Sequence, residues 1–239
     1  MPRARSLKAN ARRSNRFCRP NDPNAVLIAT GRAVKVVLRV GVFALVASLG
    51  GCSDDAQFAE FGDDAVILAF GDSLTYGTGV KTHQSYPAVL EELTGVTVIN
   101  AGVPGEESDA GAKRLSKVVA SEEPDLVILC HGGNDFLRKR PRAKTEKNLR
   151  SMINYLRERD IAVVMLGVPD FGLLLSTADV YETVADDLGV PLEDDIIADL
   201  IGQNKYKSDH VHPNADGYRM MAKAVQELLV ETGALASGE

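Results

Sequence analysis

A serine hydroxyl stands directly after an apolar run in the sequence, because AVILAF at residues 65–70 is followed by Gly71-Asp72-Ser73. A serine attacks a carbonyl carbon efficiently only when a base removes its proton and hydrogen-bond donors stabilise the oxyanion that forms. Where a strand turns into a helix, backbone N–H groups can point at such a developing charge. Ser73 is therefore a candidate nucleophile, and the alternative is that it serves as an ordinary helix cap.

A candidate base lies near the other end of the chain, in the stretch KSDHVHPNADGY at residues 207–218. Because only two residues separate Asp209 from His212, one loop can hold the carboxylate against the imidazole ring. The carboxylate would fix the tautomer of the ring and leave its other nitrogen for a serine. The competing hypothesis is a metal site made by Asp209, His210 and His212. The two remaining histidines of the chain have no metal-ligand spacing to this loop, so we predict no metal.

Candidate donors for an oxyanion occur in two other loops. Gly102 follows an apolar run at residues 96–100, and the absence of a side chain lets its N–H approach a ligand closely. Asn134, in the stretch HGGND at residues 131–135, offers a neutral amide with glycines that make room for a ligand. Each residue alone is typical of a turn. The order Ser, Gly, Asn and then Asp-x-x-His, with each residue after a strand or before the last helix, points to acyl transfer.

The elements that must position these residues alternate in type along the chain. Apolar runs predict strands at residues 65–70, 96–100, 126–130 and 161–166, and amphipathic patterns predict helices at residues 86–93, 110–120, 145–159, 177–188 and 215–231. Continuous Val, Ile and Leu runs separated by amphipathic helices indicate a parallel sheet covered on both faces. The sequence therefore predicts a doubly wound α/β domain with a single core.

In such folds, ligands bind outside the carboxyl ends of the strands. Each predicted strand is followed by a distinctive loop: GDSLTYG, AGVPGEES, HGGND and VPDFGLLLS, in chain order. We therefore expect these four loops to gather at one edge of the sheet.

The blocks GDSLTYG, NAGVPGEES, GGND and DHVHPN strongly resemble those of the SGNH or GDSL hydrolases, and most closely the bacterial arylesterase, acyl-CoA thioesterase and lysophospholipase subgroup. The resemblance spans about residues 66–230. It implies Ser73 as nucleophile, His212 as general base and Asp209 as its orienting partner. It also implies an oxyanion hole formed by the N–H groups of Ser73 and Gly102 and the side chain of Asn134. The implied fold is a flavodoxin-like, three-layer α/β/α sandwich with about five parallel strands and no cofactor.

Two further segments bear on the substrate. Leu173, Leu174 and Leu175, in the stretch FGLLLST at residues 171–177, could line an acyl pocket, or they could begin a helix and pack on the core. The basic stretch RKRPRAK at residues 138–144 is interpreted as a solvated loop. The alternative is that it attracts anionic head groups or the phosphates of a CoA ester.

These features predict a serine esterase or thioesterase, arylesterase-like or lysophospholipase-like, that acts on small-molecule esters, thioesters or lysolipids. One alternative is an esterase directed at acetyl groups of carbohydrate or cell wall, and another is a lipoprotein binding module without activity. No phosphate-binding G-x-x-x-x-G-K-[ST] motif is present, which argues against an NTPase. We expect a monomer or weak oligomer.

The N-terminal 51 residues differ sharply in charge from the rest. They hold ten of the 27 Lys and Arg residues and one of the 33 Asp and Glu residues, so the remainder carries 17 basic and 32 acidic residues. So acidic a body argues against nucleic acid as a partner. A basic segment followed by a short apolar run, VGVFALVASL at residues 40–49, is typical of a secretory signal.

The end of this signal, Leu49-Gly50-Gly51-Cys52, resembles the bacterial lipobox, in which the cysteine is lipidated. We predict a cleaved signal over residues 1–51, a linker over 52–64, the hydrolase domain over 65–234 and a tail over 235–239. The alternatives are a plain cleaved signal or an uncleaved anchor. The predicted location is the periplasmic side of a bacterial membrane. Ser53 follows Cys52, and the resemblance to lipoproteins of Gram-negative bacteria then implies the outer membrane.

Overall fold

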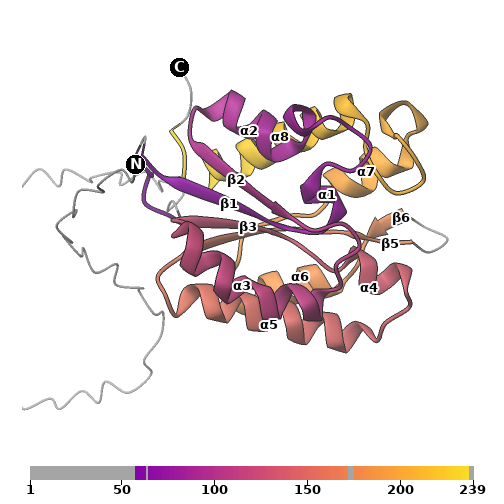
Figure 1. The fold of residues 1–239 in the computed structure, drawn as a ribbon. Helices are drawn as coiled ribbons and strands as arrows, with labels where there is room; N and C mark the ends of the chain where they lie inside the picture. Colours follow the sequence, from indigo (N-terminus) through magenta and orange to yellow (C-terminus); the bar gives the residue numbers. More distant parts are fainter. Residues whose placement is uncertain (1–56, 63, 172–174, 237–239) are drawn as a thin grey trace, which may run out of the picture. The chain divides into compact units, whose positions relative to one another are not determined.

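Five parallel strands form the central sheet of the computed structural model, which describes residues 57–62, 64–171 and 175–236 (Figure 1). Their order across the sheet is β2-β1-β3-β4-β7, and every neighbouring pair is parallel. The strands are β1 (Val66–Gly71), β2 (Thr97–Gly102), β3 (Leu126–Cys130), β4 (Ala162–Leu166) and β7 (Leu192–Glu193). The signal sequence predicted over residues 1–51 and Cys52 lie outside the described residues.

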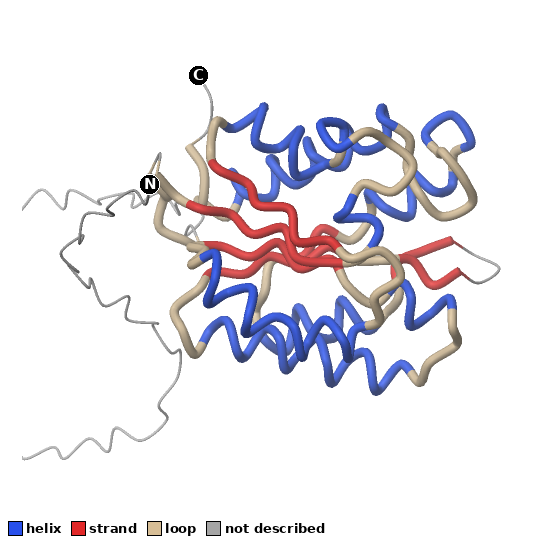
Figure 2. The backbone as a smooth tube through the Cα atoms, in the orientation of Figure 1, coloured by secondary structure: helices blue, strands red, loops and turns tan. Residues whose placement is uncertain are grey.

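Helices cover both faces of this sheet, which confirms the three-layer α/β/α fold (Figures 1 and 2). One face carries α1 (Ser73–Tyr76), α2 (Tyr86–Thr94), α7 (Ile196–Gly202) and α8 (Ala215–Glu231), and the other carries α3 (Ser108–Glu122), α4 (Gly133–Leu137), α5 (Arg142–Arg157) and α6 (Val180–Leu188). Short 3₁₀ turns occur at Thr82–Gln84 and Asn204–Tyr206. Within the described ranges, no helix combines the length and apolar character needed to cross a membrane.

Burial explains why the central strands read as unbroken apolar runs. All five residues of β3 are completely buried, as a strand covered by helices on both faces requires. On α8, Tyr218, Met221, Ala222 and Val225 are completely buried, and their spacing of three to four residues places them on one helical face. Removal of this apolar area from water is the main force that holds the helix on the sheet.

A two-stranded antiparallel hairpin follows β4 and consists of β5 (Pro169–Phe171) and β6 (Leu175–Thr177). The hypothesis that the three leucines begin a helix is wrong for Leu175, which lies in β6, and α6 begins only at Val180. Leu175 is half-buried and packs against the core. Leu173 and Leu174 lie outside the described residues.

The described part of the predicted linker is attached to the domain. Phe58 N–H donates to Thr232 O (2.9 Å), and Phe61 N–H donates to Ala234 O (3.0 Å). Both phenylalanine side chains pack against the core. Residues 58–61 therefore lie at the end of the domain where β1 begins and where α8 ends.

Candidate active site

The loop after β1 presents the Ser73 hydroxyl without using it as a cap. Asp72 is the N-cap of α1, and its Oδ1 accepts a hydrogen bond from Leu74 N–H (3.1 Å). Capping is thus performed by the residue before the serine, which leaves the Ser73 Oγ for another partner. The helix-cap alternative for Ser73 does not agree with this geometry.

The partner of the hydroxyl is an imidazole from the far end of the chain. His212 Nε2 lies 3.0 Å from Ser73 Oγ, and His212 Nδ1 lies 2.7 Å from Asp209 Oδ2. An ionised carboxylate only accepts hydrogen bonds, so Nδ1 carries the proton and donates to Asp209. Nε2 is then an acceptor for the serine O–H. The three side chains form one continuous chain of hydrogen bonds.

The carboxylate of Asp209 is held by its own loop. Its Oδ1 accepts hydrogen bonds from Val211 N–H (2.8 Å) and His212 N–H (2.9 Å). Partial burial acts to raise the pKa of Asp209, but the hydrogen bonds from the His212 ring and from these two N–H groups outweigh it and lower the pKa. Asp209 is therefore ionised over the range in which an imidazole titrates.

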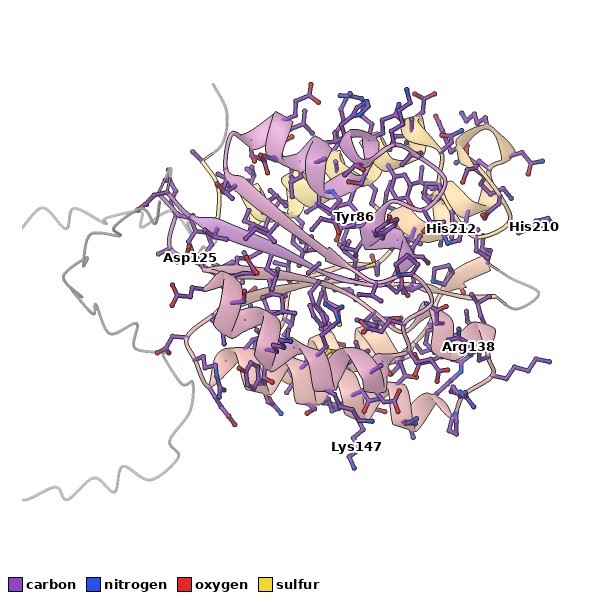
Figure 3. All side chains as sticks on the ribbon, in the orientation of Figure 1. Tyr86, Asp125, Arg138, Lys147, His210 and His212 are labelled. Carbon is purple, nitrogen blue, oxygen red and sulfur yellow. The ribbon has the colours of Figure 1, made fainter. Side chains whose placement is uncertain are left out.

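The metal-site hypothesis for this loop finds no support in the geometry. His210 is exposed and points away from the body of the protein, whereas His212 lies at the carboxyl edge of the sheet (Figure 3). Among the described residues, no group of three or more His, Cys, Asp or Glu side chains is arranged to hold a metal ion.

Asn134 lies at the start of α4, directly after β3, and is almost fully buried. Its Nδ2 donates to Asp72 Oδ2 (3.0 Å) and to Glu106 O (3.1 Å). The structure thus places the amide between the loop that carries Ser73 and the loop that follows β2. Burial raises the pKa of the Asp72 carboxyl, although nearby His131 and the hydrogen bonds to the carboxyl oppose this rise.

Gly102 is glycine for a reason other than oxyanion binding. Its N–H donates to Asn100 Oδ1 (2.9 Å), and a Cβ at this position would lie 2.1 Å from the backbone nitrogen of Tyr76. The missing side chain therefore allows the end of β2 to pack against α1. The N–H group is already occupied, which argues against the predicted donor role of Gly102.

Gly105 is a further candidate oxyanion donor, which was not predicted from the sequence. It has φ of 76° in a tight turn closed by the hydrogen bond from Glu106 N–H to Val103 O (3.1 Å). Among the described residues, the N–H groups of Gly105 and of Ser73 have no acceptor. Pro104-Gly105, a pair typical of such a turn, was the signal in the sequence that could have identified it.

A small cavity adjoins the serine and the imidazole. It holds about 20 Å³, and Ser73, His212, Asn134, Leu137 and Val168 are among its lining residues. Leu175 does not line it. Leu137 is 46% exposed, so the cavity opens onto an apolar rim.

The basic stretch at residues 138–144 is largely paired with carboxylates. Arg138 and Arg140 contact Glu107, at 3.2 and 2.9 Å. Lys144 contacts Asp109 (3.1 Å), and Arg142 contacts Asp170. These side chains are about half exposed, so the stretch is solvated and its charges are partnered. The prediction of a loop holds only for residues 138–141, because α5 begins at Arg142.

Comparison with known proteins identifies the family to which this site belongs. Residues 69–220, more than half of the chain, match the family described as GDSL-like lipase/acylhydrolase. The chain belongs to this family. Like other GDSL hydrolases, it is a hydrolase that acts on ester bonds, and at the level of the family it is an esterase or thioesterase.

Two relatives of this GDSL hydrolase come from bacteria. The chain is 30% identical to an arylesterase of Vibrio mimicus over 176 residues, which cover 69% of this chain and 88% of the relative. It is 26% identical to the thioesterase 1/protease 1/lysophospholipase L1 of Escherichia coli over 175 residues, which cover 68% of this chain and 84% of that protein. The crystal structure of TesA superposes with a TM-score of 0.63 at 28% identity, and the match covers 69% of this chain and 97% of TesA.

Proposed function

We propose that this GDSL hydrolase cleaves carboxylic esters or thioesters through an acyl-enzyme, with Ser73 as nucleophile, His212 as general base and Asp209 as the partner of the imidazole. The observation that carries the proposal is the continuous hydrogen-bond chain from Asp209 Oδ2 through both ring nitrogens of His212 to Ser73 Oγ. Ser73 and His212 are 139 residues apart in sequence and meet only in the fold.

In the first half of the reaction, His212 Nε2 takes the proton of Ser73 as Oγ forms a bond to the carbonyl carbon. The tetrahedral intermediate collapses when the bond to the alcohol or thiol breaks, and the imidazolium gives its proton to that leaving group. Asp209 stabilises the imidazolium in between. In the second half, water attacks the acyl-enzyme, His212 accepts its proton and returns it to Ser73 Oγ, and the carboxylic acid leaves.

The oxyanion hole is formed by the N–H groups of Ser73 and Gly105 together with Asn134 Nδ2. We assign Gly105 in place of Gly102, since the N–H of Gly105 has no acceptor among the described residues and that of Gly102 is bonded to Asn100. Asn134 Nδ2 donates to Asp72 and Glu106 in the free protein. One of these two hydrogen bonds is exchanged for the oxyanion in the transition state.

The substrate is a small-molecule ester with an apolar part, as in an arylesterase or lysophospholipase. Leu137, Val103 and Tyr76 are the exposed apolar side chains near the loops that carry the site, at 46%, 39% and 54% exposure. Strand β5 contacts α4, which contributes Asn134 and Leu137 to the cavity. This contact brings the β5–β6 hairpin near the entrance of the cavity, where Leu175 would meet a longer acyl chain.

A second candidate, an esterase directed at acetyl groups, is favoured by the size of the cavity. A volume of about 20 Å³ accommodates little more than one water-sized group. An acetyl methyl group fits such a space, whereas a longer chain must extend over the rim at Leu137.

The test is hydrolysis of p-nitrophenyl esters from acetyl to palmitoyl by the purified protein and by Ser73→Ala, with and without a chelator. We expect Ser73→Ala to lose activity by about 10⁴-fold or more and the chelator to have no effect. A maximum at acetyl would select the second candidate, and a maximum at longer chains would select the first. Equal or absent activity in folded wild type and folded Ser73→Ala would contradict the proposal and favour a binding module without catalytic activity.

We also propose export and a lipid anchor at Cys52. Helix α8 begins three residues after His212, and its 17 residues span about 25 Å, so Thr232 lies far from the catalytic edge. The segment that leads toward Cys52 is bonded to this distant end, through Phe58 and Phe61. An anchor joined to the domain through this segment would leave the catalytic edge accessible. Labelling with radioactive palmitate should mark the wild type and spare Cys52→Ser, and equal labelling would contradict the anchor.

A further inference from the structure

Three charged or titratable side chains form a cluster behind the oxyanion loop, and the mechanism above uses none of them. The Glu106 carboxylate accepts hydrogen bonds from Arg114 Nη2 (2.6 Å) and Nε (2.9 Å), and it lies 3.1 Å from His131 Nε2. The side chains of His131, Glu106 and Arg114 are 0%, 8% and 23% exposed. Burial of charged groups is costly unless close pairing and further hydrogen bonds offset the loss of hydration.

Arg114 links the cluster to the ends of β1 and β2 by hydrogen bonds. Its Nη2 donates to Ala101 O (3.1 Å) in β2 and approaches Gly71 O (3.4 Å) at the end of β1. Its guanidinium also lies over the ring of Phe70, 4.2 Å from the centroid. One side chain on α3 therefore contacts the strand that leads into Ser73 and the strand that leads into the oxyanion loop.

Glu106 ties the same cluster to the proposed donors. The backbone carbonyl of Glu106 accepts the hydrogen bond from Asn134 Nδ2 (3.1 Å). Glu106 also directly follows Gly105 in the sequence. Arg114 and His131 thus hold the carboxylate of Glu106. The backbone of the same residue is bonded to one proposed donor, Asn134, and follows another, Gly105. Rotation or displacement of Glu106 would move both donors together.

The His131 ring is tightly packed and makes one side-chain hydrogen bond within the described part of the chain. Its Nε2 donates to Glu106, and its Nδ1 has no partner among the described residues. The ring packs against Phe70, with centroids 5.6 Å apart, and a Cβ at Gly111 would lie 2.3 Å from Nε2. The imidazole therefore fills a tight slot in which it can only orient the carboxylate.

We propose that Glu106, Arg114 and His131 are positioning residues that hold the oxyanion hole in its reactive geometry. The inference rests on the proposed function, because an oxyanion hole has meaning only if Ser73 is the nucleophile. None of the three touches the reacting atoms. A displacement of about 1 Å in a group that stabilises a transition state can reduce the rate by about 10²-fold.

The experiment compares two ion-pair deletions of matched exposure in the full-length protein. Arg114→Met removes the ion pair with Glu106, and Arg150→Met removes an arginine of α5 that is 25% exposed and bonded to Glu146 and to Asp187 of α6. We expect Arg114→Met to lower kcat about 10- to 100-fold with KM nearly unchanged, since only the transition state uses the hole. Arg150→Met should leave kcat within about 2-fold of the wild type.

Two further readouts separate positioning from general loss of structure. The rate constant for inactivation by a p-nitrophenyl phosphonate should fall in Arg114→Met by the same factor as kcat, because the phosphonyl oxygen occupies the same hole. The midpoint of the pH profile of kcat/KM should not move, because the Asp209–His212–Ser73 hydrogen-bond chain is unaltered. Glu106→Gln keeps the size of the side chain and should show the same pattern if Arg114→Met does not fold.

Wild-type kcat in folded Arg114→Met and Glu106→Gln, with Ser73→Ala inactive, would overturn the positioning role and leave the proposed function intact. The same conclusion follows if KM rises while kcat stays unchanged. Retained activity in Ser73→Ala would overturn the proposed function and this inference with it.

Discussion

On one side of Ser73, the Asp209–His212 pair belongs to a single loop, and the Asp209 side chain is 49% exposed. On the other side, Asn134 is almost fully buried and is held by Asp72 and Glu106, which are 62 and 28 residues away in sequence. The general base and its carboxylate partner come from one solvent-exposed loop, whereas the Asn134 amide is buried and held by groups from three loops.

The difference follows from what each side must do. The imidazole moves a proton back and forth, and a short loop with hydrogen bonds from Ser208 N–H to His212 O (2.9 Å) and from Asn214 N–H to Tyr206 O (2.8 Å) is sufficient to present it. Oxyanion donors must already be in place when charge develops, since their reorganisation would add to the barrier. Buried hydrogen bonds from several loops restrict such movement.

The largest expected effect is that of His212→Ala, which removes the base that both halves of the reaction require. We expect kcat/KM to fall by about 10⁴-fold. His210→Ala is the matched control, because His210 is exposed and points away from the site, and it should stay within about 2-fold of the wild type. Similar losses in the two variants would contradict the assignment of the base.

Asn134→Ala tests the buried side. Loss of one oxyanion donor should lower kcat by about 10² to 10³-fold. The melting temperature should also fall, because the buried Asp72 carboxylate loses a donor at 3.0 Å. Asn154→Ala, at an exposed position of α5, should change neither quantity. A folded Asn134→Ala with wild-type activity would remove this residue from the oxyanion hole.

Asp209→Asn tests the exposed Asp209–His212 loop. We expect it to lower kcat by about 10²-fold, which is less than the loss expected for Asn134→Ala. Asparagine can still accept the two backbone N–H groups, but its amide faces His212 Nδ1 and favours the wrong tautomer. Water reaches this half-exposed position and takes over part of the stabilisation of the imidazolium. A loss larger than that of Asn134→Ala in steady-state kinetics would reverse the comparison between the two sides.

The smallest expected effect concerns stability in acid. Burial acts to raise the pKa of Glu106, but hydrogen bonds from His131 and Arg114 outweigh it and lower the pKa to about 2. The folded state therefore favours the carboxylate, and this stabilisation is complete above the ordinary glutamate pKa of 4.5 and is lost as pH falls from 4.5 toward 2. We expect Glu106→Gln to lose about 1–2 kcal/mol of this pH-dependent part of the free energy of unfolding.

Urea unfolding at pH 7, 5, 4 and 3 measures this effect. The wild type and Glu106→Gln should differ most at pH 7 and converge toward pH 3, while Asp209→Asn should follow the wild type more closely because its carboxylate is half exposed. A constant difference between wild type and Glu106→Gln at all four pH values would show that the carboxylate does not titrate as described.

Most of the regular elements could be predicted because each carries its own pattern. The strand predicted at residues 126–130 and the helix predicted at 215–231 have these bounds in the structure, and the other predicted elements differ by at most three residues at either end. Strand β7, with two residues, and the β5–β6 hairpin, with three residues in each strand, were not predicted. Strands this short carry no periodicity, and only pairing with a neighbour makes them strands.

By itself, the sequence determined the reactive residue types and the local unit that joins two of them. Asp209 and His212 are three residues apart, so hydrogen bonds within one loop are enough to set their contact. The tertiary structure alone decided that Asp72 caps α1, that the N–H of Gly102 is occupied and that of Gly105 is not, and that Glu106, Arg114 and His131 meet behind the site. These contacts join separate loops, and their distances depend on the register of β1, β2 and β3, which no local pattern encodes.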